Sequence, residues 1–212
     1  DSVKSRGLGD VYKRQSLSGV EVVVGSAGDD SVTVSTNDIE AISGGDGIDD
    51  VTLTDASGNT VDLAGVEVIT GSAGDDILTV TDDTSVMVDG GDGADTLIGN
   101  VGDDTLLGGS GSDTLIGGGG ADVVDGGQDD DLLELDGSAG VTAEGGDGTD
   151  TVVLVGETNE ASLSGVEVVV GSAGDDSLTV STNDIEAISG GDGIDDVTLT
   201  DASGNTVDLA GV

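Results

Sequence analysis

Large aliphatic residues recur every nine positions in the middle of the chain, between Gly90 and Glu134. Five nonapeptides follow one another there without a gap, and the eighth position is always Leu or Val: Leu97, Leu106, Leu115, Val124 and Leu133. The first position is always Gly: Gly90, Gly99, Gly108, Gly117 and Gly126. The sixth is always Asp: Asp95, Asp104, Asp113, Asp122 and Asp131. This period predicts a repeat architecture in which each unit is a turn followed by a short strand.

Six isolated copies of the same unit lie outside the unbroken run. Their first positions are Gly25, Gly44, Gly71, Gly145, Gly171 and Gly190, and their sixth positions are Asp30, Asp49, Asp76, Asp150, Asp176 and Asp195. Several neighbouring copies are 19 residues apart, which is two nonapeptides plus one residue. We therefore expect the winding to continue through segments that lack the motif, such as Val34–Ser43 and Val80–Asp89.

The remaining segments alternate between apolar and polar residues as strands do. Val51–Thr54, Val61–Leu63 and Val66–Val68 each predict a strand with its apolar side chains on one face. Gly58–Asn59 predicts a turn between two of these strands. Because no stretch longer than a turn or two follows the helical period, the fold class is all-β.

The charge of the chain changes this picture. Its 212 residues include 45 Asp and Glu but only four Lys and Arg, which gives a formal net charge of −41. Such acidity predicts disorder, yet 34% of the residues are hydrophobic, mostly Val, Leu, Ile and Ala. The two facts agree if bound cations complete the fold.

Composition also excludes several functions. The negative charge should repel nucleic acid and anionic lipid. No apolar run approaches the roughly 20 residues of a membrane-spanning helix, so we expect no membrane insertion by this segment. The absence of Cys and His excludes disulfides, zinc and haem sites, and Cys- or His-based catalysis.

The sequence divides into four regions. Residues 1–15 hold all the basic residues and the only Tyr, and we interpret them as a non-native leader of translated adapter sequence, with a natural disordered leader as the alternative. Residues 16–89 carry isolated motifs, and residues 90–153 carry the contiguous nonapeptides. Residues 154–212 are a truncated region in which Ser162–Val212 repeats Ser16–Val66 with one difference, Leu178 for Val32. We expect the chain to be a piece of a longer repeat protein.

The pattern G-G-x-G-x-D-x-U-x, where U is a large aliphatic, resembles the repeat-in-toxin (RTX), or hemolysin-type, calcium-binding repeat. The resemblance covers most of residues 25–198. It implies a right-handed parallel β-roll of two thin sheets, with two nonapeptides in a coil of about 18 residues and several Ca²⁺ ions between stacked turns. Calcium takes six to eight oxygen ligands and accepts backbone carbonyls as well as carboxylates. Glycine lets the turns adopt positive φ.

The sixth-position Asp residues and the first-position Gly residues are therefore the candidate metal-site residues. Asp95 should face Asp113 across an ion, and likewise Asp104 with Asp122 and Asp113 with Asp131. Weaker candidates are the 19-residue pairs Asp30 with Asp49, Asp76 with Asp95, Asp131 with Asp150, and Asp176 with Asp195. Asp129 stands where a turn Gly is expected, which departs from the family pattern.

Other interpretations explain less. A flexible acidic linker accounts for the glycine and the charge but not for aliphatic residues in phase with Asp. A genuine roll whose isolated motifs have lost their metal remains open. No stretch fits the EF-hand loop. We expect no enzyme, because no nucleophile has a base beside it. The loops lack the outward Thr rows of ice-binding rolls.

The family resemblance also implies a biological setting. Such proteins leave Gram-negative bacteria unfolded, by type I secretion, and fold when they meet extracellular calcium. One hypothesis is a structural module of a large secreted or cell-surface protein, adhesin-like or matrix-like, whose partners are calcium and neighbouring repeats. The other is the export and folding module of a secreted toxin or enzyme whose active domain lies elsewhere.

Overall fold

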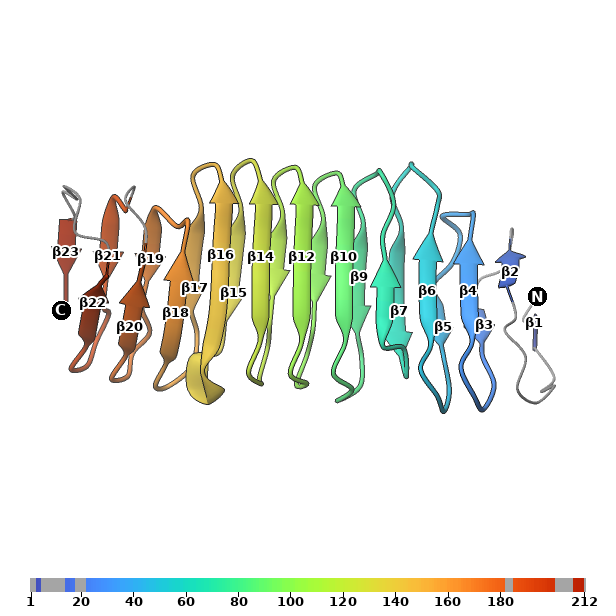
Figure 1. The fold of residues 1–212 in the computed structure, drawn as a ribbon, viewed down its shortest axis with the longest axis horizontal. Helices are drawn as coiled ribbons and strands as arrows, with labels where there is room; N and C mark the ends of the chain where they lie inside the picture. Colours follow the sequence, from blue (N-terminus) through green and yellow to red (C-terminus); the bar gives the residue numbers. More distant parts are fainter. Residues whose placement is uncertain (1–2, 5–13, 18–21, 182–184, 201–207, 212) are drawn as a thin grey trace.

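The computed structural model describes residues 3–4, 14–17, 22–181, 185–200 and 208–211. These residues form a β-solenoid in which successive strands alternate between two sheets (Figure 1). Every pairing between the described strands is parallel and joins a strand to the second strand after it in the chain. The coil is right-handed (Figure 1). The all-β parallel β-roll predicted from the repeats is thus confirmed.

Among the described residues, the first sheet has 12 strands: β1 (Val3–Lys4), β3 (Val22–Val24), β5 (Ala41–Ser43), β7 (Thr60–Ala64), β9 (Ile77–Val80), β11 (Thr96–Ile98), β13 (Thr114–Ile116), β15 (Leu132–Leu135), β17 (Thr151–Leu154), β19 (Val168–Val170), β21 (Ala187–Ser189) and β23 (Asp208–Ala210). The second has 11: β2 (Arg14–Leu17), β4 (Ser31–Val34), β6 (Asp50–Leu53), β8 (Val68–Thr70), β10 (Met87–Asp92), β12 (Thr105–Ser110), β14 (Val123–Gln128), β16 (Val141–Asp147), β18 (Glu160–Ser164), β20 (Ser177–Val180) and β22 (Asp196–Leu199). The helical residues among those described form one short 3₁₀ turn, η1 (Gly137–Ala139).

The core is a narrow stack of aliphatic side chains between the two sheets. Leu97, Leu115 and Leu133 lie in register on β11, β13 and β15 and have no exposed surface. Leu106 and Val124 face them from β12 and β14. Because successive side chains of a strand point to opposite faces, each short strand needs only one or two apolar residues to cover the core. The inward orientation predicted for the eighth position is confirmed.

Segments without the motif keep the same winding. Val34–Ser43 supplies β5, and Val80–Asp89 leads into β10, and both strands take regular places in their sheets. Gly58–Asn59 lies in the turn before β7, as predicted.

The predicted strand Val66–Val68 is wrong. Val66 is buried in the turn, whereas β8 starts at Val68, whose side chain is half-exposed and points outward. Ile69 is the residue that enters the core. Glu67, the residue before β8, accepts a hydrogen bond from the backbone N–H of Asp49 in the neighbouring coil.

The four regions distinguished in the sequence differ in how regularly the nonapeptide motif occurs. The boundaries at 89/90 and 153/154 fall inside β10 and β17, and both sheets continue across them. Of the interpreted leader, residues 1–15, the structure describes Val3–Lys4 in β1 and Arg14–Gln15 in β2. The rest of that segment lies outside the described residues.

Candidate calcium sites

Each motif turn crosses from one sheet to the other and ends at its sixth-position Asp, immediately before a strand. The turns therefore stack along two edges of the solenoid (Figure 1). Along one edge, turns lead into the first sheet and end at Asp76, Asp95, Asp113, Asp131 and Asp150. Along the other, turns lead into the second sheet and end at Asp30, Asp49, Asp104, Asp122, Asp176 and Asp195.

Stacked Asp residues contact one another directly. The backbone N–H of Asp95 donates to Oδ1 of Asp113 at 2.7 Å, that of Asp104 to Oδ1 of Asp122 at 2.9 Å, and that of Asp113 to Oδ1 of Asp131 at 2.8 Å. The 19-residue pairs make the same bond at 2.7–3.0 Å: Asp30 with Asp49, Asp76 with Asp95, Asp131 with Asp150, and Asp176 with Asp195. The structure brings together all seven pairs that the sequence predicted.

The second oxygen of most of these carboxylates has no partner. In the part of the chain that the structure describes, Oδ2 is buried and makes no hydrogen bond in eight of them: Asp49, Asp95, Asp104, Asp113, Asp122, Asp131, Asp150 and Asp195. Burying a carboxylate oxygen without a partner is costly. A cation at each Oδ2 removes that cost, so these residues fit a metal ion.

The first-position glycines lie against these carboxylates. A Cβ on Gly108 would lie 2.5 Å from Oδ2 of Asp113 and would overlap the carbonyl oxygen of Gly126 in the next coil. The second and fourth positions of this turn, Gly109 and Gly111, have φ of 110° and 118°. The same two neighbours, the carboxylate of the turn's own Asp and a backbone carbonyl of the next coil, lie beside Gly90, Gly99 and Gly126, whereas at Gly117 the nearest atoms all belong to Asp122.

Carboxylates alone do not make a complete site. Within the described ranges, no group of three or more acidic side chains converges as a metal-binding cluster. Calcium needs six to eight oxygens, so the glycine-turn carbonyls and water would have to supply the others. This division of ligands suits a hard cation that accepts carbonyl oxygens, and it does not suit zinc.

Comparison with known families identifies the repeat. The RTX calcium-binding nonapeptide repeat matches this chain in four copies, at residues 63–83, 87–115, 98–133 and 107–141. This chain carries RTX calcium-binding repeats. The matches include the five contiguous nonapeptides and the isolated motif at Gly71, and the presence of RTX repeats implies calcium binding by the repeat module as a whole. Among curated proteins, no match to the chain is found.

The RTX turn at Gly126 tolerates its departure from the family pattern. Asp129 adopts φ of 73°, and Asn100, which replaces a second-position glycine, adopts φ of 83°. Asp and Asn enter this left-handed region more readily than other non-glycine residues. Asp131 still accepts the hydrogen bond from the N–H of Asp113. The series of such bonds between the sixth-position Asp residues of stacked turns, which we call a ladder, therefore continues through this turn.

Sequence reasoning missed the residues that extend the RTX ladders. Oε2 of Glu67 accepts the N–H of Asp49, and Oε2 of Glu167 accepts that of Asp150, both at 2.7 Å. A longer acidic side chain here takes the place of the next Asp. The signal is a Glu 17 or 18 residues after a sixth-position Asp.

A second set of missed contacts lies outside the ladders. Some fifth-position Asp side chains accept the N–H of the fifth residue one coil later, such as Asp103 from Ala121 at 2.9 Å and Asp130 from Thr149 at 2.8 Å. These exposed bonds hold the turns in stack. Their signal is an acid next to the sixth-position Asp.

Burial makes the ladder carboxylates hard to ionise in the absence of metal. It raises the pKa of Asp95, Asp104 and Asp131 to about 6 and that of Asp113 to about 7. Backbone hydrogen bonds partly oppose this rise, and neighbouring carboxylates add to it. The pKa values of Asp49, Asp122 and Asp150 are also raised, mainly by burial. The sites therefore favour a bound positive charge, whether proton or metal ion.

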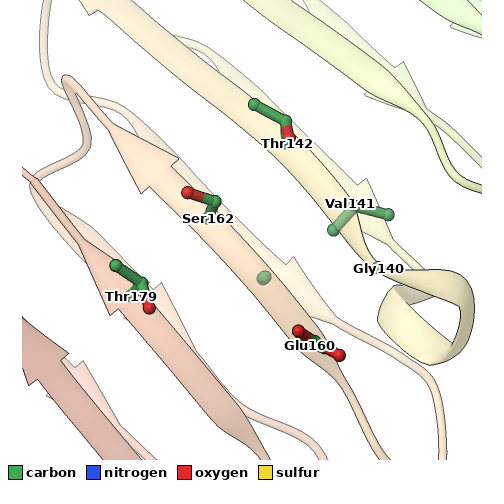
Figure 2. A pocket seen from close by; sticks show the side chains of 7 residues that line it. Gly140, Val141, Thr142, Glu160, Ser162 and Thr179 are labelled. Atoms are coloured by element: carbon green, nitrogen blue, oxygen red, sulfur yellow. The ribbon is translucent and has the colours of Figure 1, made fainter.

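A separate depression lies on the outer face of the second sheet (Figure 2). Thr142, Ser162 and Thr179 lie in register on β16, β18 and β20, and Glu160 lies nearer the start of β18. These side chains are exposed and belong to no ladder. Within the described residues, no helix is long and apolar enough to cross a bilayer.

Proposed function

We propose that calcium binding at the turns of this repeat module drives its folding and makes it rigid. The observation that carries the proposal is the set of eight buried Oδ2 atoms without a hydrogen-bond partner, four along each edge of the described solenoid. In this proposal the eight Asp residues supply the charge. Their glycine turns supply carbonyl oxygens, and the ion joins consecutive coils.

The charge balance of the chain supports the coupling between metal and fold. All Lys and Arg residues lie at positions 4, 6, 13 and 14, so the repeats contain no cationic side chain of their own. The ladders bring buried carboxylates together along both edges of a solenoid whose aliphatic core is narrow. Without calcium their repulsion and desolvation oppose folding, and with calcium binding energy becomes folding energy.

Circular dichroism of the chain tests this proposal. In the presence of chelator we expect a spectrum of unfolded chain, and on addition of millimolar calcium a cooperative gain of β-sheet signal. The proposal fails if the β content is the same with chelator and with calcium. Isothermal titration calorimetry on the same samples should show binding over the calcium range in which the fold appears.

For the parent protein, we propose a large secreted or cell-surface protein in which this segment is a calcium-stiffened structural spacer, with no enzymatic role of its own. RTX repeats are typical of secreted proteins. The segments Ser16–Val66 and Ser162–Val212 are nearly identical and lie 146 residues apart, which favours a long repetitive array. The second candidate is the export and folding module of a type I-secreted toxin or enzyme. Long-read sequencing of the flanking DNA separates them: further copies of the unit favour the spacer, and a catalytic domain favours the export module.

A further inference from the structure

The motif turns fall into two classes that differ at the second position. Eight turns carry Gly or Asn there, and these are the turns whose Asp has an unpartnered Oδ2. The other three read G-S-A-G-D-D and carry Ser26, Ser72 and Ser172. Their sixth-position residues are Asp30, Asp76 and Asp176, and none of these has an unpartnered buried oxygen.

In the serine turns, donors of the protein itself occupy the Oδ2 atom that stays open in the glycine turns. Ser72 donates to Oδ2 of Asp76 through both its backbone N–H, at 2.7 Å, and its hydroxyl, at 3.0 Å. Asn59 in the preceding coil donates its N–H and its side-chain amide to Oδ1 of Asp76, each at 2.7 Å. Asp76 is fully buried, so these four bonds replace water on both of its oxygens.

The same arrangement recurs where the turn lies on the opposite edge. Ser172 donates its N–H to Oδ2 of Asp176 at 2.8 Å, and Asn159 donates its amide to Oδ1 at 2.8 Å. Ser26 contacts Oδ2 of Asp30 through its N–H at 2.6 Å and its hydroxyl at 2.9 Å. Serine thus closes Oδ2 in all three turns, and at Asp76 and Asp176 an Asn of the preceding coil also closes Oδ1. The turns at Ser26 and Ser172 belong to the two near-identical copies of the repeated segment, and the turn at Ser72 lies outside them.

Backbone conformation separates the two classes. At the second position Gly91 and Gly109 have φ of 108° and 110°, and Asn100 has φ of 83°, whereas Ser26, Ser72 and Ser172 have no positive φ. A residue with a side chain rarely adopts positive φ. Serine therefore keeps a conformation in which its N–H reaches Oδ2, and glycine allows a turn in which Oδ2 is left open.

We propose that the second-position residue decides whether a turn binds calcium, and that the three serine turns are closed without an ion. This inference rests on the proposed function, because it divides the same set of turns into binding and non-binding ones. Asp30, Asp76 and Asp176 then act as structural links, with the serine donors in the place of the cation. The ladder of calcium turns is interrupted at fixed points by metal-independent ones.

Counting bound ions tests the division. Equilibrium dialysis with radioactive calcium should be done on the full chain at saturation and compared with Ser72→Gly, Ser172→Gly and the double variant. We expect one additional ion for each single variant and two for the double variant. The matched control is Ser72→Ala, which keeps the backbone restriction and the N–H donor and should leave the count unchanged.

A second pair of variants tests the same inference from the other side. Asp113→Asn, in a glycine turn, should lower the ion count, whereas Asp76→Asn, in a serine turn, should leave it unchanged. Circular dichroism in calcium confirms that each variant is folded. Calcium bound by the unsubstituted chain, together with an unchanged count in Ser72→Gly and an equal loss in both Asp variants, overturns the inference alone. A chain that binds no calcium overturns the proposed function and the inference with it.

Discussion

A single Asp oxygen explains why glycine opens each nonapeptide. Oδ2 of the sixth residue lies close to the place that a Cβ on the first residue of the turn would take. In the contiguous turns that begin at Gly90, Gly99, Gly108 and Gly126, a carbonyl oxygen of the next coil lies close to that place as well. The glycine is thus required by contact with neighbouring atoms, because the space for a side chain is already filled. The pattern of the sequence predicts glycine here but does not reveal this crowding.

Two glycine variants in neighbouring turns test this crowding. Gly108→Ala places a methyl group against Asp113 and Gly126, and should lower the free energy of unfolding in calcium by about 1–3 kcal/mol, as overpacking does. Gly119→Ala is the control, because the nearest atom to its Cβ would be Cγ1 of Val101 at 3.8 Å. Its effect should stay within about 0.5 kcal/mol. Thermal unfolding in saturating calcium measures both, and equal losses would contradict the explanation.

The raised pKa values of the ladder carboxylates predict how the metal-free chain responds to pH. An Asp whose pKa rises from 3.8 to about 6 or 7 on folding binds protons more tightly in the folded state. Its favourable contribution is complete below pH 3.8 and is lost as the pH rises through 6 to 7. In calcium-free buffer the β signal should therefore grow as the pH falls from 7 to 5. An Asp with an ordinary pKa is already ionised throughout that window.

Circular dichroism across this pH range, with metal removed by a chelating resin, checks the prediction. At pH 5, protons should also compete with calcium, so more calcium should be needed for half-maximal binding than at pH 7. The pKa shifts would be contradicted if the β signal of the metal-free chain stayed constant, or increased, as the pH rises from 5 to 7.

At the scale of one coil, two strands and two turns supply a single layer of core. The layer stays dry only because the same aliphatic position recurs in the next coil, as Leu97, Leu115 and Leu133 do. Each coil therefore depends on both neighbours, and a defect in one layer exposes the layers beside it.

A cavity in a central layer should accordingly be costly. Leu115→Ala removes a fully buried side chain from β13 and should lower the free energy of unfolding by about 2–5 kcal/mol. Thr114→Ala, on the outward face of the same strand, is the control and should change it by less than about 0.5 kcal/mol. Calcium-saturated thermal or denaturant unfolding measures the difference. Similar losses for the two variants would mean that the narrow core contributes little.

The regular coils can be predicted from the sequence because two nonapeptides have the same length as one coil, so equivalent motif positions contact each other. Eighteen residues separate Asp95 from Asp113, so the motif itself places them side by side. In the regions with isolated motifs the coil length varies, so the sequence spacing no longer shows which side chains point inward. The alternating pattern places Val68 in the core, but in the structure Ile69 is buried and Val68 points outward. The sequence marks the isolated motifs as weaker metal candidates than the contiguous ones, but the motif alone does not show that Ser72 saturates Asp76 while Asp113 keeps an open oxygen.

For the molecule as a whole, the size of the cation should matter as much as its charge. Magnesium carries the same charge as calcium but demands near-ideal octahedral geometry and keeps several waters, whereas calcium accepts six to eight irregular oxygens. Turns built from one carboxylate oxygen and packed carbonyls suit calcium. Magnesium at the same concentration and ionic strength should therefore produce little of the β signal that calcium produces. Folding at equal midpoints in the two salts would show that screening of the −41 charge is sufficient.

The direction of the bonds between coils has a mechanical consequence. The strand-to-strand hydrogen bonds and the Asp-to-amide bonds all link one coil to the next, along the long axis of the solenoid (Figure 1). Because the coils are linked in series along this axis, a stretching force should break the interfaces between them one after another, and the coils should unfold in sequence. Ions bound between coils would strengthen these interfaces, so the force needed to extend the chain should rise with the concentration of calcium.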